Sequence, residues 1–183
     1  MGSQLYDIVL GPDGIKAILA ASKPGVLDSR GADMGYLHDL SLLGAVQCGV
    51  RMNPDAIRPA MGADAAVKAQ VNIGRLSEAE TIARIISSTD RQVVLTLQGW
   101  AAPVGDLDEN RLAAALNLYG QVAQTLEAKG SRIGGPGASG EGTGAKAEVT
   151  LTETLYEREQ GFTWGYFEAR VVISYRAVIR QSF

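Results

Sequence analysis

The sequence predicts an α+β (α/β) subunit: a mostly antiparallel sheet with two or three helices packed on one face, plus an irregular N-terminal arm. Residues 91–100 and 167–179 alternate apolar and polar side chains, as half-buried strands do. Residues 108–129 repeat apolar side chains every three or four positions, which is typical of an amphipathic helix. With 46% hydrophobic and 20% charged residues, a chain of 183 residues can bury one core, so we predict a single domain, 1–183.

The N-terminal half gives weaker signals. Asp13 can cap a short helix that residues 23–25, Lys-Pro-Gly, bring to an end. Apolar residues at 37–46 lead into a short predicted strand that includes Cys48. Prolines and alanine-rich stretches without a clear period make 26–74 a candidate arm or insertion.

A second helix is predicted after this segment. Ser77 and Glu80 have the spacing of a capping box, in which each side chain accepts a hydrogen bond from a backbone N–H at the helix start. Ile82 and Ile85 then supply an apolar face, and the helix is expected to stop near Ser88.

The C-terminal half has a clearer pattern. After the strand at 91–100 and a turn, Asp106 or Asp108 can cap a helix that runs to Lys129, with Gly130 as its stop. The predicted apolar face of this helix consists of Leu112, Leu116, Tyr119, Val122, Ala123 and Leu126.

A glycine-rich stretch separates this helix from two final strands. Residues 131–146 contain almost no apolar anchor and are predicted to form a flexible loop. Strands are predicted at 147–156 and 167–179. The last strand would be about 45 Å long, more than a small sheet usually needs, so we expect its surplus to project or to pair with a neighbouring subunit.

Composition excludes several classes of protein. The net charge of −3 argues against a broad basic surface for nucleic acid, and no apolar run approaches the roughly 20 residues of a membrane-spanning helix. A lone cysteine cannot form an internal disulfide, and no leader pattern precedes Leu5, so we expect synthesis in the cytosol.

No motif predicts a cofactor, a metal site or catalysis. The glycines of 135–140 match a dinucleotide-binding string, but a helix precedes them and a strand follows, which is the reverse of what that motif requires. His38 and Cys48 would need carboxylates such as Asp39 to hold zinc, and they lack zinc-motif spacing. A small hydrolase that uses His38 with Ser41 or Cys48 stays an alternative on sequence proximity alone.

Aromatic side chains gather around the last two strands. They either form the edge of the core and a cross-strand ladder, or they contact another protein. Arginines on the polar face of the last strand are expected to contact a neighbouring subunit or partner, and charge reversal there should weaken assembly but not unfold the subunit. The candidate interface residues are Trp100, Tyr156, Phe162, Trp164, Tyr166, Arg170 and Arg176.

The C-terminal half resembles a known family in its order of elements. Strand 91–100 contains Val-Leu-Thr-Leu-Gln-Gly-Trp at 94–100 and is followed by the amphipathic helix and the glycine-rich loop. The final pair of strands is joined through Tyr-Glu-Arg-Glu-Gln-Gly-Phe at 156–162 and continues into Tyr-Phe-Glu-Ala-Arg at 166–170. In this order the chain resembles the tail terminator, or tail completion, proteins of long-tailed bacteriophages.

That resemblance implies a structural virion protein without enzymatic activity, assembled in the host cytoplasm. It implies a homohexameric ring that caps the head-proximal end of the tail tube, halts its growth and joins it to the neck. The partners would be further copies of the chain and tube, sheath and neck proteins, with DNA passing through without specific binding. Another neck, sheath-initiating or baseplate ring is the alternative within the same particle.

Overall fold

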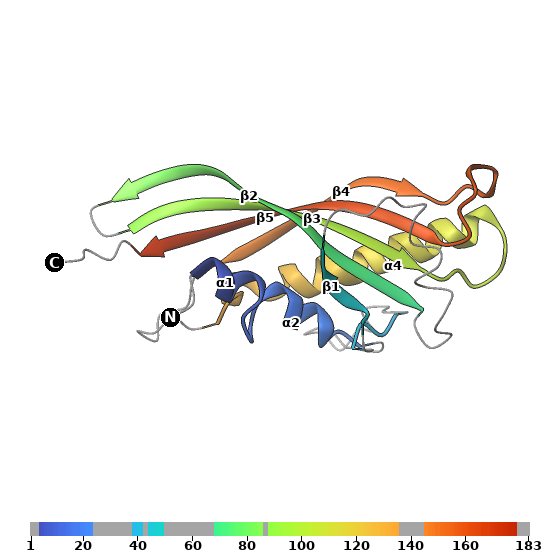
Figure 1. Ribbon diagram of the computed structural model, residues 1–183, viewed down its shortest axis with the longest axis horizontal. Helices are drawn as coiled ribbons and strands as arrows, with labels where there is room; N and C mark the ends of the chain where they lie inside the picture. Colours follow the sequence, from blue (N-terminus) through green and yellow to red (C-terminus); the bar gives the residue numbers. More distant parts are fainter. Residues whose placement is uncertain are drawn as a thin grey trace.

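The computed structural model contains one five-stranded sheet, in the order β1-β2-β3-β5-β4 (Figure 1). It describes residues 4–23, 38–41, 44–49, 68–85, 88–135 and 145–178, with the backbone alone for 78–85, 88, 89 and 178. The strands are β1 (Val46–Cys48), β2 (Ala69–Ile85), β3 (Ser88–Ala101), β4 (Lys146–Leu155) and β5 (Gly165–Val178). Apart from the parallel pair β1–β2, all neighbouring strands are antiparallel, which confirms the predicted sheet.

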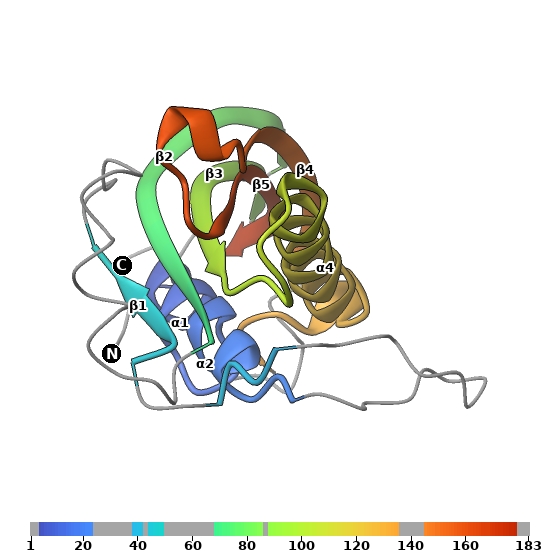
Figure 2. The same cartoon turned by 90° about the vertical axis from the view of Figure 1, so that its right-hand side faces the viewer.

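Among the described residues, three α-helices lie on one side of this sheet (Figures 1 and 2). They are α1 (Gln4–Val9), α2 (Ile15–Ala20) and α4 (Asp108–Glu127), accompanied by the short 3₁₀ turns η2 (Gly130–Arg132) and η3 (Arg158–Gln160). The prediction of helices on one face is therefore confirmed. Helix α1 was not predicted from the sequence, and α2 begins after Gly14 without a side-chain cap, so the predicted capping role of Asp13 is wrong.

The helix predicted from Ser77 is also wrong, because this segment belongs to the long strand β2. Its backbone pairs with β3 as far as Ile85, opposite Ser88. The pairing of β2 with β3 has three register shifts. Such irregularities allow β2 to be a strand although apolar and polar residues do not alternate strictly along its sequence. The capping box is a local signal of about 1 kcal/mol, and a continuous ladder with a neighbouring strand outweighs it.

The predicted strands in the second half are confirmed. β3 and β5 pair without a register shift from Ser88 opposite Val178 to Ala101 opposite Gly165. The alternate residues that face the helices are buried on both strands. They are Val93, Leu95 and Leu97 on β3, and Phe167, Ala169, Val171, Ile173 and Tyr175 on β5.

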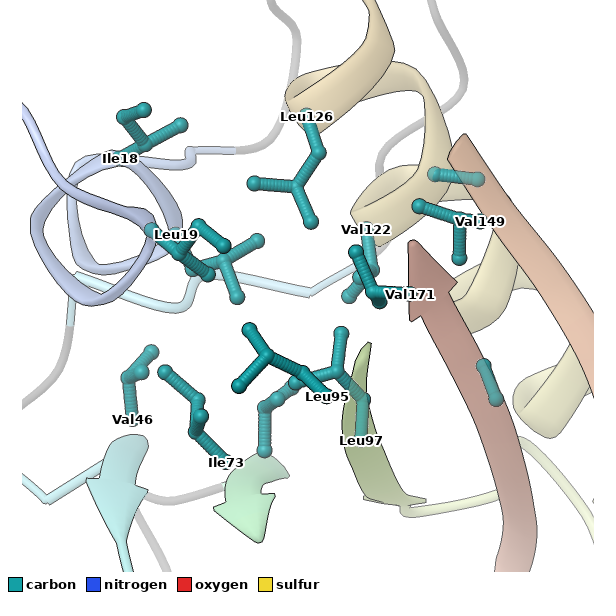
Figure 3. Close-up of a cluster of buried hydrophobic side chains, with 14 of the residues drawn as sticks. Ile18, Leu19, Val46, Ile73, Leu95, Leu97, Val122, Leu126, Val149 and Val171 are labelled. Carbon is teal, nitrogen blue, oxygen red and sulfur yellow. The ribbon is translucent and has the colours of Figure 1, made fainter. Parts of the chain in front are cut away.

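The main core lies between this face of the sheet and the helices. Leu95 and Val171 of the sheet lie close to Val122 of α4 and Leu19 of α2 (Figure 3). The predicted apolar face of α4 is wrong at Leu116, which is 42% exposed. The buried stripe consists of Arg111, Ala114, Ala115, Leu118, Gln121, Val122, Ala123 and Leu126, so it contains two polar side chains.

The predicted arm and the predicted glycine loop are described only in part. Within 26–74, β1 and residues 69–74 of β2 are strands of the sheet. Within 131–146, Ile133 is buried and forms an isolated bridge with Ala145. Gly130 has a φ of +56° just after α4, in keeping with its predicted role as a helix stop. Apart from 38–41, 44–49 and 68–74, the first segment lies outside the described residues, as do residues 136–144 of the second.

The start of β5 passes very close to α4. A Cβ atom on Gly165 would overlap the backbone oxygen of Arg111 and lie 2.8 Å from the backbone nitrogen of Ala115. Both atoms belong to the helix backbone and cannot move aside as a flexible side chain can. Glycine at 165 is therefore a condition for this helix–strand contact.

We predict that Gly165→Ala lowers the free energy of unfolding by about 1–3 kcal/mol, because the added methyl group forces α4 away from β5. Gly120→Ala is the matched control. Gly120 lies within α4 with no atom near its Cβ position, so alanine there should stabilise the protein by up to about 1 kcal/mol. Urea unfolding measures both changes, and equal effects of the two substitutions would contradict the close contact.

Candidate interaction surfaces

A buried arginine holds two loops together at one end of the sheet. Arg111 of α4 donates from Nε to the carbonyl oxygen of Tyr156 at 2.7 Å and from Nη1 to the carbonyl oxygen of Asp106 at 3.1 Å. Its Nη2 pairs with the carboxylate of Asp108. The β3–α4 loop and the β4–β5 connection are thus fixed to the same guanidinium group, and Figure 1 shows both at this end of the molecule.

Arg158 adds a second, exposed layer to this junction. Its backbone N–H donates to Asp108 Oδ1 at 3.1 Å, and its side chain pairs with Asp106 Oδ2 at 3.0 Å. The backbone N–H of Arg158, followed by the Arg111 side chain, lowers the pKa of the Asp108 carboxyl group. Asp108 therefore stays ionised at neutral pH.

Two apolar side chains are exposed next to these charges. Val104 is 89% exposed and Leu107 is 67% exposed in the loop that leads into α4. Neither residue is among the interface residues predicted from the sequence. The available signal was a pair of aliphatic residues inside a turn rich in proline, glycine and aspartate, where no strand or helix period requires them.

The face of the sheet that points away from α4 carries a buried polar row. Asn72 Nδ2 donates to Gln98 Oε1 at 3.3 Å, and Gln98 Nε2 donates to the Tyr166 hydroxyl at 3.0 Å. That hydroxyl donates to Glu168 Oε2 at 2.9 Å. The row links β2, β3 and β5, so it fixes their relative register through side chains as well as backbone.

The predicted interface residues separate into buried and accessible groups. Trp100 and Tyr166 are buried, with ring centroids 5.3 Å apart, and Leu155 and Trp164 pack against them. Trp100 and Tyr166 thus form a cross-strand contact inside the subunit, which leaves them little surface for a partner.

The other candidates remain accessible. Tyr156, Phe162 and Trp164 are half-buried near the Arg111 junction. Arg170 and Arg176 are exposed on the sheet face that points away from α4, and Arg176 Nε pairs with Asp90 Oδ1 at 3.0 Å. Three of the predicted aromatic interface residues therefore lie at the end of the sheet near Arg111, and the two predicted interface arginines lie on the sheet face that points away from α4.

His38 is buried in a separate polar cluster. Gln121 of α4 donates from Nε2 to the His38 carbonyl oxygen at 2.6 Å and to the Ser22 hydroxyl at 2.9 Å. Neither imidazole nitrogen of His38 has a hydrogen-bond partner within the described residues. Burial lowers the pKa of His38, while the nearby Ala114 backbone acts in the opposite direction.

The geometry gives no support to a catalytic pair around His38. The Ser41 hydroxyl donates to the Asp39 carboxylate, two residues away, and the same contact lowers the pKa of Asp39. Cys48 is exposed, and partial burial of its thiol raises its pKa, which disfavours the reactive thiolate. In the part of the chain that the structure describes, no three histidine, cysteine or acidic residues are placed to share a metal ion.

The two outer edges of the sheet differ. On β4, the backbone N–H of Val149 donates to Glu127 Oε1 at 3.0 Å, and its carbonyl oxygen accepts from the Tyr119 hydroxyl at 3.2 Å. Side chains of α4 thus cover the middle of this edge. On the other side, β1 pairs with β2 only at Val71–Ile73, and beyond Gly74 the outer edge of β2 has no strand partner among the described residues.

Comparison with models of protein families gives no match for this chain, and comparison with curated proteins gives none either. Among the described helices, none is both long enough and apolar enough to cross a membrane.

We predict that Arg111→Met lowers the free energy of unfolding by about 1.5–3 kcal/mol, because several charge-assisted hydrogen bonds are lost while the aliphatic volume is kept. Arg158→Met, which removes only an exposed ion pair, should cost less than about 1 kcal/mol. Thermal and urea unfolding of both variants test this difference. An Arg111 variant as stable as the Arg158 variant would show that the junction does not depend on the buried guanidinium.

We predict that His38 makes the fold less stable in mild acid. Because its folded pKa is below the ordinary value of about 6.5, the unfolded chain binds this proton first as the pH falls. Its effect is absent well above pH 6.5, grows as the pH falls below that value, and levels off below the lowered pKa. His38→Leu should flatten the curve of unfolding free energy against pH in this window, and an unchanged slope would contradict the prediction.

Proposed function

We propose that this protein is a structural component of a bacteriophage virion: a tail terminator that forms a ring at the head-proximal end of the tail tube and joins the tube to the neck. The proposal rests on the resemblance of the C-terminal half to that family. In this role the protein has no enzymatic activity, assembles in the host cytoplasm, and has further copies of itself and tube, sheath and neck proteins as partners.

The observation that carries the proposal is a three-stranded extension beyond the rest of the sheet. β4 begins at Lys146, opposite Ser174, so β5 continues past it through residues 175–178, paired with residues 88–91 of β3. Residues 81–85 of β2 complete the extension on the other side (Figure 1). The strands of this extension lie beyond the start of β4 and are not needed to complete the rest of the sheet. Their extra length is therefore available for contact with another subunit.

The edges of the sheet favour contacts between subunits at the β2 side. On the β5 side of the extension, the carbonyl oxygen of Arg176 accepts a hydrogen bond from Gln4 Nε2 of α1 at 2.7 Å. An edge that lacks a partner presents backbone donors and acceptors to another chain. The outer edge of β2 beyond Gly74 is a long edge of this kind among the described strands.

The charge of the chain is compatible with a conduit for DNA. A ring through which DNA passes should not hold phosphate groups tightly, and the net charge of −3 disfavours such binding. Another neck, sheath-initiating or baseplate ring would satisfy the same constraint. Binding to purified tail-tube ends rather than to head connectors separates the terminator from these alternatives.

The test is native mass spectrometry and negative-stain microscopy of the purified chain at micromolar concentration. We expect hexameric rings that bind tail-tube ends. Arg170→Glu should keep the fold, because the side chain is exposed, and raise the concentration needed for rings by roughly tenfold. Lys129→Glu, an exposed charge reversal just after α4, is the matched control and should leave assembly unchanged.

A monomer at every concentration, with no binding to tube ends, would overturn the proposal. A hydrolytic activity lost in His38→Ala would favour the small hydrolase instead. Equal assembly of the Arg170 and Lys129 variants would remove the sheet face around Arg170 from the ring interface.

A further inference from the structure

The acidic end, comprising residues 104–109 and 156–162, combines exposed apolar side chains with several exposed carboxylates. Val104 and Leu107 are largely exposed, and the half-buried Phe162 lies on the neighbouring connection that Arg158 ties to Asp106. Isolated exposed apolar residues are ordinary on protein surfaces. Here two of them share one short loop, held in place by the buried Arg111.

The charges around these side chains are strongly biased. The exposed carboxylates of the acidic end are Asp106, Asp108, Glu109, Glu157 and Glu159. Together with the exposed Arg158 these side chains sum to −4, and the buried Arg111 beside them brings the charge of the acidic end to −3. The whole chain also carries −3, which means that the remainder of the protein is neutral.

This distribution identifies the kind of occupant. Two acidic ends from two copies would repel each other, since like charges brought together cost several kcal/mol. The rest of a second copy has a net charge of zero, so it has no net positive charge to attract the acidic end. An apolar centre with an acidic rim is instead complementary to a shallow apolar socket lined by lysine and arginine.

We infer that the acidic end docks a different protein, one that presents an apolar socket rimmed by basic side chains, and that Val104 and Leu107 are its central contacts. The inference rests on the proposed function only in placing that partner next to the ring in the tail or neck. The contact is separate from the sheet face and strand edge proposed for ring formation.

The test uses a synthetic amphipathic peptide of leucine and lysine, free of tryptophan, titrated into the full chain. The two tryptophans of the protein, Trp100 and Trp164, pack at or beside the acidic end, so their fluorescence reports binding there. We expect saturable binding that weakens as salt rises. Matched peptides with glutamate in place of lysine, or with serine in place of leucine, should bind at least about tenfold more weakly.

Variants then locate the contact. Val104→Ser combined with Leu107→Ser should weaken peptide binding about tenfold or more, whereas Leu10→Ser, at a residue 45% exposed beside α1, should have no effect. A triple Glu109→Gln, Glu157→Gln and Glu159→Gln variant should reduce both affinity and salt dependence. None of these three side chains forms an ion pair or a hydrogen bond in the described structure, so the fold should be kept.

Native mass spectrometry of the same variants separates this inference from the proposed function. Loss of peptide binding with unchanged rings supports the docking surface. Peptide binding at the acidic end by a chain that forms no ring also supports it, while overturning the ring. Equal binding by all variants, or loss of rings in the Val104 and Leu107 variant, would overturn the inference; the second result would assign this surface to a second copy.

Discussion

The uninterrupted pairing of β3 with β5 is the constraint on which the rest of the structure depends. Their fourteen residue pairs run without a register shift from one end of the sheet to the other. Because side chains alternate along a strand, a slip of one residue would turn either Leu95 or Val171 away from the helices and bring neighbours such as Thr96 or Arg170 into the core. The fixed register therefore defines one apolar face for α4 and one polar face opposite it.

The polar face is organised by the same register. Gln98 lies opposite Glu168 and Trp100 lies opposite Tyr166, which places the hydrogen-bonded row and the aromatic pair on neighbouring steps of the ladder. Asn72 extends the row onto β2. Of the aromatic residues predicted to contact a partner, Trp100 and Tyr166 thus pack inside the subunit. The accessible ones lie at the ends of the strands, near Arg111.

The two ends of the molecule differ in structure. At one end, Arg111 fixes two loops, one of which carries the exposed Val104 and Leu107 next to several carboxylates. At the other, three strands continue beyond β4 with an outer edge on β2. An elongated subunit with two unlike ends can contact different neighbours at each, which suits a component that joins one part of a particle to another.

The sequence by itself determined the strands β3, β4 and β5, the helix α4 and the single helical layer, because each has an apolar period that matches its own backbone repeat. Only the tertiary structure decided the state of 77–85, where pairing with β3 overrides a helix cap, since a ladder spreads its stabilisation over many residues. It also decided that Arg111 is buried rather than Leu116. A guanidinium that finds carbonyl oxygens from two separate loops and two carboxylates near the start of α4 can leave water, and no periodicity in the sequence records those partners.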